Sequence, residues 1–206
     1  MYIPNQFQET DRTVLYQFIR DNPFALLVAN GSTNEAPLAT HLPIELHTDA
    51  RGEWQLVGHL AKANPQSKRL GSETPALAVF SGPHAYISSS WYDHVNVPTW
   101  NYLSVQVTGL TRLLDSDETL ELLRQQVDRY EVDSRCPVSV ASMTEAYVRK
   151  EMRGVVAFSM QIGTIQGAAK LSQNRDDKNH AAIVDALTQQ NDFNANRVAE
   201  EMIKRR

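Results

Sequence analysis

The sequence predicts an α+β protein, a single domain built on a β-barrel, and three observations support this prediction. Six or seven β-type segments follow one another along the chain, helical segments lie at both ends, and strands do not alternate with helices. Consecutive strands followed by consecutive helices are typical of α+β domains, whereas a doubly wound parallel sheet requires alternation. The 206 residues suit one barrel domain. A chain of this size buries roughly 70% of its unfolded surface, so it needs no disulfide or metal to fold.

The first half of the chain is rich in strand patterns. Residues 10–21 predict a helix, because apolar side chains recur at helical spacing and Asn22-Pro23 stops the helix. Six strands are then expected, at residues 24–29, 36–46, 53–60, 76–81, 85–90 and 102–114. Pro37 and Pro43 make the second of these an edge or bulged strand, and Gly82-Pro83 is expected to separate the fourth from the fifth.

The second half of the chain is mainly helical. Residues 115–130 form an amphipathic helix pattern with Asp115 or Ser116 as the N-cap, and residues 144–152 predict another helix. A further strand is expected at residues 154–166. The C-terminal extension, residues 175–206, is helical in composition with a break near residues 191–194.

Charge and hydropathy exclude several classes of protein. The chain has 20 Lys and Arg residues against 24 Asp and Glu residues, a formal net charge of −4, which argues against a broadly basic nucleic-acid coat. Its mean hydropathy is −0.40, and the longest apolar run, residues 24–29, is far shorter than the roughly 20 residues of a membrane span. No signal peptide is visible and the single Cys136 excludes an internal disulfide, so we expect a cytoplasmic protein without membrane contact.

Common signatures of nucleotide binding and catalysis are missing from the sequence. There is no G-x-G-x-x-G after a strand, no G-x-x-x-x-G-K-[ST], no G-x-S-x-G and no H-E-x-x-H. Three short segments remain as candidates, and each has a structural alternative.

The first candidate segment, residues 58–66, leaves a strand and enters a helix at Asn64-Pro65. Exposed backbone amides at such a helix start, with His59 and Lys62 beside them, would suit a phosphate group. The alternative is an ordinary helix start with a solvated Lys62, since helix starts far outnumber phosphate sites.

The second candidate segment, residues 88–102, contains two Trp, two Tyr and three consecutive Ser residues. Its rings could stack on a planar ligand while hydroxyl groups and Asn101 bind the polar edge of that ligand. An aromatic cluster in the core or at a dimer interface explains the same composition. A metal site made from His41, His84 and His94 has no i,i+4 pair or acidic partner to support it.

The third candidate segment is residues 170–180. Lys170 and Arg175 flank the polar residues 172–174, directly before a helix that Asp176 or Asp177 can cap. The segment could present cations and amides to an anion, or it could be a solvated turn.

Taken in chain order, these segments resemble the PaiB family. The resemblance rests on MYIPNQF at the start, ATHLPIEL, GHLAKANPQ, FSGPHAYISSSWY, VPTWNY and KLSQNR, and it extends from Met1 to about Arg175. The family belongs to the FMN-binding split-barrel superfamily, which is related in fold to pyridoxamine phosphate oxidases. The resemblance therefore implies a six-stranded split β-barrel with flanking helices, a homodimer, and FMN bound near the subunit interface.

The family motifs also imply positions for the cofactor site. Thr40-His41 is implied near the isoalloxazine ring and residues 59–65 at the ribityl phosphate. The residues that the motifs imply for cofactor binding are Thr40, His41, His59, Lys62, Asn64, Pro65, Ser88, Ser89, Ser90, Trp91, Tyr92, Thr99, Trp100, Asn101, Lys170, Ser172, Gln173 and Asn174. No catalytic residue is defined, and His41 and Tyr92 are the candidates for proton transfer.

Two kinds of function follow from the resemblance. The family takes its name from a negative regulator of protease synthesis and sporulation, which implies an FMN-binding transcriptional regulator. Direct DNA binding is weakly supported by charge, because residues 170–206 hold seven Lys and Arg against six Asp and Glu, and Lys204-Arg205-Arg206 is the one tight basic cluster. The alternative is a small flavin-dependent oxidoreductase or flavin reductase, in which the cofactor carries the redox chemistry. A protein that binds haem or another ring would use the same aromatic and His residues.

Overall fold

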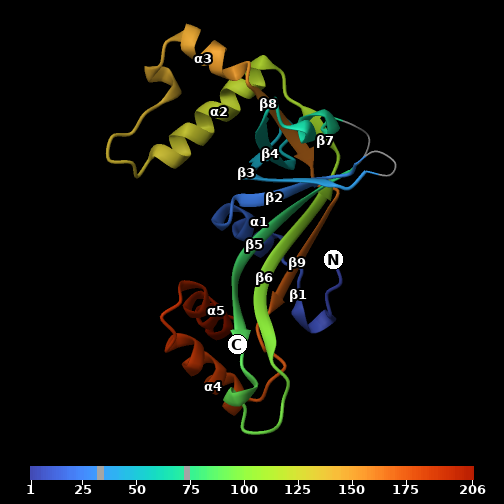
Figure 1. Ribbon diagram of the computed structural model, residues 1–206, viewed down its shortest axis with the longest axis vertical. Coiled ribbons are helices and arrows are strands. Elements are labelled where there is room, and N and C mark those ends of the chain that lie inside the picture. The colour runs from blue at the N-terminus through green and yellow to red at the C-terminus, as the bar shows by residue number, and fades with distance from the viewer. Residues whose placement is uncertain (32–34, 72–74) are drawn as a thin grey trace. The chain divides into compact units, whose positions relative to one another are not determined.

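A computed structural model of the chain describes residues 1–31, 35–71 and 75–206 (Figure 1). The chain forms two compact units, each assembled from segments that are distant in sequence. The terminal unit comprises residues 1–22, 80–106 and 165–206, and the central unit comprises residues 23–79 and 107–164.

The terminal unit is a sheet packed against helices. Its strands are hydrogen-bonded in the order β1-β9-β6-β5. They are β1 (Gln8–Glu9), β9 (Thr164–Lys170), β6 (Thr99–Gly109) and β5 (Ala76–Ile87), of which β5 and β6 begin or end in the central unit. The helices are η1 (Asn5–Phe7), α1 (Arg12–Asp21), η3 (Ser89–Trp91), α4 (Asp177–Thr188) and α5 (Phe193–Lys204).

The core of the terminal unit lies between its sheet and its last two helices. Figure 1 shows α4 and α5, drawn in red, next to each other, and they pack together. Fully buried Ile183 of α4 and Val198 of α5 share one hydrophobic cluster with Ile87 of β5 and Leu103 of β6. This cluster fixes the ends of β5, β6 and β9, from which the second and third candidate segments emerge.

The central unit holds the remaining strands. The start of β5 pairs with β2, and the order continues β2-β3-β4-β8-β7. The strands are β2 (Phe24–Ala29), β3 (Leu38–Thr48), β4 (Trp54–Ala61), β7 (Thr111–Leu113) and β8 (Val155–Gln161), all antiparallel to their neighbours. The helices are η2 (Pro65–Arg69), α2 (Ser116–Glu131), η4 (Val140–Ser142) and α3 (Glu145–Met152).

Helix α2 begins where the sequence predicted, at a capping box. The Asp115 carboxylate accepts bonds from the amides of Asp117 and Glu118, and the Glu118 side chain bonds back to the Asp115 amide. Leu122 of α2 then packs on Val57 of β4 and Ala157 of β8, which holds the helix against the sheet.

The prediction of two strands divided at Gly82-Pro83 was wrong, because β5 runs without a break through both residues. Gly82 lies so close to α1 that a Cβ there would be 2.7 Å from the Phe18 ring. The glycine therefore permits close packing of a helix on the strand rather than a turn, and a local sequence pattern cannot distinguish these two uses.

Two other predicted strands each proved to be a pair. Residues 102–114 hold the end of β6 and all of β7, and residues 154–166 hold β8 and the start of β9, with a short turn at residues 162–163. The described residues thus form nine strands rather than the six or seven expected, of which β1 and β7 are only two and three residues long. The α+β class itself is confirmed. Within the described ranges, none of the helices has the length and apolar character needed to cross a membrane.

Candidate functional site

The structure divides the implied cofactor residues into two groups, one in each unit. The central unit holds Thr40, His41, His59, Lys62, Asn64 and Pro65, on β3, β4 and the segment that follows β4. The terminal unit holds Ser88, Ser89, Ser90, Trp91, Tyr92, Thr99, Trp100, Asn101, Lys170, Ser172, Gln173 and Asn174, around η3 and the ends of β6 and β9.

A buried glutamine organises the group in the central unit. Gln66 is 1% exposed and its Nε2 donates to the Leu27 carbonyl of β2 at 2.9 Å. Thr40 Oγ1 donates to Gln66 Oε1 at 2.6 Å, and Asn64 Nδ2 donates to Thr40 Oγ1 at 2.9 Å. Thr40 and Asn64 therefore fasten the segment after β4 to β2 and β3. Sequence reasoning missed Gln66, because only its distant partners reveal its role.

Several backbone amides around Asn64-Pro65, where the motif implies a phosphate, are used within the fold. The helix that starts there is η2, a 3-10 helix of five residues, and the Asn64 side chain itself accepts from the Gln66 amide at 2.9 Å. The Ser67 amide donates to the Asn64 carbonyl and the Lys62 amide to the Gly154 carbonyl. These backbone donors are occupied, so the Lys62 ammonium, which is exposed, is the group here that can meet a phosphate.

Two exposed rings of the central unit, those of Phe24 and His41, form a defined surface. His41 is registered opposite Leu26 on β2, so the side chain of Phe24, two residues before Leu26, lies on the same face. The rings of Phe24 and His41 stack with centroids 5.9 Å apart and an interplanar angle of 21°. Phe24 is 66% exposed, so this pair offers a flat surface to a planar ligand.

His59 does not have the position expected of a phosphate ligand. Its Nδ1 atom is buried and has no hydrogen-bond partner among the described residues. Burial lowers the pKa of His59 below 6.5, against smaller opposing effects of Gln126 on α2 and Glu45 on β3. The neutral imidazole is therefore favoured, and a neutral ring adds no charge to anion binding.

Glu45 is the charged member of this buried layer, and sequence reasoning missed it. It is 2% exposed, and its Oε2 lies 3.2 Å from His47 Nε2. Burial, together with the charge of Glu45, raises the pKa of Tyr130 on α2 to about 12. A buried carboxylate facing α2 thus belongs to the support of the sheet rather than to an open site.

The pH dependence of stability tests the burial of His59. Because the folded pKa of His59 is below 6.5, the unfolded chain binds more protons, and the free energy of unfolding falls as pH drops below about 6.5. His59→Gln cannot take up that proton, so we expect a shallower loss of stability between about pH 7 and about pH 5. Urea unfolding at each pH measures this. The variant keeps part of the pH dependence of stability, because the pKa of His180 is also lowered by burial. If stability fell as steeply with pH in His59→Gln as in the wild type, the burial of His59 would be contradicted.

In the terminal unit, the structure separates core aromatics from exposed ones. Tyr92 is 8% exposed and lies in the hydrophobic core, with Trp91 packed against it. Trp100 is 53% exposed and its ring lies 5.8 Å from that of Tyr86. Trp91 and Tyr92 therefore belong to an aromatic cluster of the core, which is the alternative that the sequence left open. Trp100 is exposed and can stack on a ligand. Because the Tyr92 ring lies in this core, a role for its hydroxyl in proton transfer stays a prediction.

The serine run forms a local cap. The Ser88 hydroxyl accepts from the Ser90 amide at 3.2 Å and lies 2.8 Å from the Ser90 hydroxyl. Ser88 thus begins η3, and its side chain is used within the turn.

The end of β9 and the following turn are braced from β6. Asn101 is fully buried, and its side-chain amide exchanges hydrogen bonds of 3.0 and 3.1 Å with the Ser172 hydroxyl. Ser172 has a φ of 58°, which non-glycine residues seldom adopt. Lys170 Nζ donates to the Thr99 hydroxyl. The structure thus brings implied residues of β6 and β9 together, and their role in cofactor binding stays a prediction.

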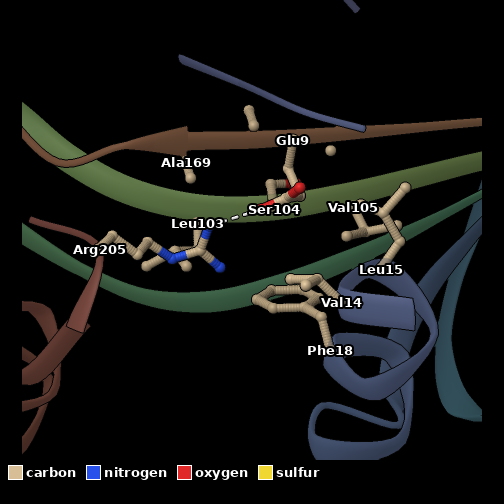
Figure 2. Close-up of a pocket in the computed structure, with 11 residues that line it drawn as sticks. Glu9, Val14, Leu15, Phe18, Leu103, Ser104, Val105, Ala169 and Arg205 are labelled. Carbon is tan, nitrogen blue, oxygen red and sulfur yellow. Dashed lines mark hydrogen bonds and ion pairs between the residues drawn. The ribbon is translucent and has the colours of Figure 1, made fainter. Parts of the chain in front are cut away.

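The hollows of the terminal unit lie elsewhere. Figure 2 shows one between α1, β6, β9 and Arg205, with a volume of about 10 Å³, enough for about one water molecule. A second, of about 260 Å³, lies between α1 and α5 and includes Phe18, Leu103 and Arg197 in its wall. Neither wall contains an implied cofactor residue, so these hollows do not identify the cofactor site.

Comparison with solved structures defines the class of fold. The chain is similar to the FAD and heme binding protein from Mycobacterium smegmatis, with a TM-score of 0.62 and 18% identity over 85% of this chain and 78% of that one. It is equally similar to the flavocytochrome Anf3 from Azotobacter vinelandii, with a TM-score of 0.62 and 18% identity over 87% and 78% of the two chains. The protein therefore has the split-barrel fold of flavin-binding proteins, as expected.

Sequence comparison gives the family. Residues 1–164 match the family described as "Putative FMN-binding domain". The chain is 36% identical over 202 residues to the Protease synthase and sporulation protein PAI 2 of Bacillus subtilis (strain 168), covering 98% of this chain and 96% of that protein. The protein belongs to the PaiB family of FMN-binding proteins, which confirms FMN as its cofactor at the level of the family.

Proposed function

We propose that this protein is an FMN-binding negative regulator of gene expression whose effect depends on its flavin and not on direct DNA contact. Family membership over nearly the whole chain is the observation that carries the flavin. The name of the Bacillus subtilis relative, a protease synthase and sporulation protein, supports the regulatory part. An absorbance scan of purified protein with and without added FMN tests the flavin part, and it also distinguishes flavin from haem.

The side chains of the central unit fit the chemistry of FMN. The Phe24–His41 pair provides a flat apolar surface of the kind that an isoalloxazine ring stacks on. Exposed Lys62 provides a cation for the ribityl phosphate. Bound flavin supplies redox chemistry, while the chain supplies position and electrostatics. Thr40 and Asn64 act indirectly, since their side chains hold the segment that carries Lys62.

A flavin-dependent oxidoreductase is the second candidate function. The observation that favours it is His41, an exposed imidazole that stacks on Phe24 at the surface offered to a planar ligand. Loss of NADH- or NADPH-dependent flavin reduction in His41→Asn, with FMN still bound, would support an enzyme. If the FMN-loaded wild type shows no such activity, the regulator remains the better account of its function.

We propose that the protein is a homodimer and that its interface includes residues 88–102. Val95, Val97 and Trp100 of this segment are 101%, 70% and 53% exposed, an unusual display of large apolar side chains for one short stretch. A second copy of the chain would cover them. We expect light scattering to give the dimer mass at micromolar concentration and Val95→Asp/Val97→Asp to lower it toward the monomer. A wild type that stays monomeric would contradict the proposal.

Binding to duplex DNA is expected to be weak and unselective. The basic C-terminal cluster is already paired within the terminal unit: Lys204 with Glu201, Arg205 with Glu9 and Glu201, and Arg206 with Asp177. Three free cations would give a slope of log affinity against log salt of about −2.7, and pairing makes it shallower. Titration of labelled promoter and scrambled DNA at several salt concentrations measures this slope. Tight, sequence-selective binding with a steep slope would restore a direct repressor.

A further inference from the structure

Two cations at the end of β9 have no carboxylate partner among the residues that the structure describes. Lys170 and Arg175 are both half-buried, and neither forms an ion pair within the described ranges of the chain. Burial, and then the charge of Arg175, lowers the pKa of Lys170. Arg205, another half-buried arginine of the same unit, is paired with both Glu9 and Glu201. Partly buried cations are normally compensated in this way, so the two at β9 lack a counter-charge.

The nearby carboxylates are used by other groups. Asp93, next to Tyr92, binds Lys178 at 2.9 Å and the Asn179 side chain at 3.0 Å. Asp176 caps α4 by accepting from the Asn179 amide at 2.9 Å. Asp177 pairs with Arg206. These acidic side chains therefore leave the charges of Lys170 and Arg175 available to a ligand.

Buried donors without acceptors accompany the two cations. The Arg175 guanidinium carbon lies 5.1 Å from the centre of the Tyr92 ring. Tyr92 is 8% exposed, and neither its hydroxyl oxygen nor the Nε of Arg175 has a hydrogen-bond partner among the described residues, although both atoms are buried. A buried donor without an acceptor is destabilising, so the arrangement requires an explanation.

The turn that carries the cations is held in a strained conformation. Ser172, between Lys170 and Arg175, has a φ of 58° and is fixed by Asn101. Gln173 bonds to the Leu171 amide at 2.7 Å and to the Ala169 carbonyl at 2.6 Å. Strain that is held in place by surrounding bonds is concentrated at ligand sites.

We propose that Arg175, Tyr92 and Lys170 form a binding site for a phosphate group in the terminal unit. A phosphate carries up to two negative charges and several acceptor oxygens, which matches two unpaired cations and a set of unused donors. The arginine offers its Nε–H in the planar fork that suits oxyanions, the tyrosine a hydroxyl, and the lysine the N–H groups not used by Thr99. The site is separate in sequence and unit from Lys62.

The phosphate can belong to a free ion or small phosphorylated metabolite, or to FMN itself. Only in the latter case does the inference rest on the proposed function, namely on its flavin part, and the phosphate of FMN would then lie at this site instead of at Lys62. The first arm of the test therefore uses inorganic phosphate alone on the full chain. A ligand that binds the folded state raises the melting temperature with its concentration. We expect phosphate to raise it relative to chloride at equal ionic strength.

Two variants make this arm specific. Arg175→Gln is expected to abolish the phosphate-dependent rise, and exposed Arg135→Gln serves as its matched control. Tyr92→Phe removes only the hydroxyl, so stability without phosphate is expected to stay equal or increase, because a buried unsatisfied group is lost. The response of Tyr92→Phe to phosphate is expected to weaken severalfold. A merely structural hydroxyl would lower stability in both conditions alike.

The second arm compares FMN with riboflavin, which lacks the phosphate. If Arg175→Gln weakens FMN binding but not riboflavin binding, the site takes the phosphate of FMN. If the variant loses only the inorganic-phosphate response, the site takes another phosphate. Either result supports the site, and the first arm stands even when no flavin binds. Equal phosphate responses in the wild type, Arg175→Gln and Tyr92→Phe would overturn the proposal.

Discussion

Replacing Lys62 with glutamate is expected to weaken FMN binding about tenfold or more while leaving the free energy of unfolding within about 0.5 kcal/mol. The Lys62 side chain is exposed and forms no ion pair within the described residues, so the fold loses little. A charge reversal next to a phosphate replaces attraction by repulsion. Quenching of flavin fluorescence on titration gives the affinity, and urea unfolding gives the stability.

Lys68→Glu is the matched control for this prediction. Lys68 is also exposed and lies on η2, six residues further along the chain. Its replacement by glutamate changes the net charge of the protein by the same amount as Lys62→Glu. Its affinity for FMN is expected to stay within about twofold of the wild type, since general charge is screened over a Debye length of about 10 Å. Equal affinities for FMN in both variants and the wild type would exclude Lys62 from phosphate binding.

Replacing Gln66 with leucine is expected to lower the free energy of unfolding by about 3 kcal/mol. The substitution conserves approximate size but leaves the Leu27 carbonyl and the Thr40 hydroxyl without the partners that Gln66 provides. Each buried polar group left unsatisfied is destabilising by about 1–3 kcal/mol. Thermal and urea unfolding of the full chain measure the loss.

Gln125→Leu gives the comparison for Gln66→Leu. Gln125 is exposed on α2, and its side chain donates to Glu121, one helical turn away. Removing this exposed amide is expected to change the free energy of unfolding by about 0.5 kcal/mol or less. A Gln66→Leu variant as stable as Gln125→Leu would show that the network around Thr40 does not hold the segment after β4.

Local signals in the sequence were sufficient for the helices and for most of the strands. Asp115 and Asp176, each one of two residues expected to cap its helix, accept the backbone bonds of an N-cap. These features depend on neighbours within three residues, so they can be read without knowing the fold. In the KLSQN turn, residues 170–174, the bonds of Gln173 are local, whereas Lys170 and Ser172 bond to Thr99 and Asn101 on the distant strand β6.

Features that depend on distant contacts were not predictable. Gly82 marks a close approach of Phe18, 64 positions earlier in the sequence, rather than a turn. The pairing of Arg205 with Glu9 joins residues 196 positions apart and neutralises part of a cluster that looked free for DNA. His59 and Tyr92 were assigned to the cofactor from their motifs, but burial against α2 and in the terminal core decides their environments.

Binding of FMN to the purified full chain tests the central claim most directly. The protein is incubated with excess FMN, separated from free flavin by gel filtration, and scanned for flavin absorbance in the protein peak. We expect FMN to comigrate with the protein, with less flavin retained by Lys62→Glu than by Lys68→Glu. Protein that elutes without flavin, after incubation with FMN at saturating concentration, would contradict the account.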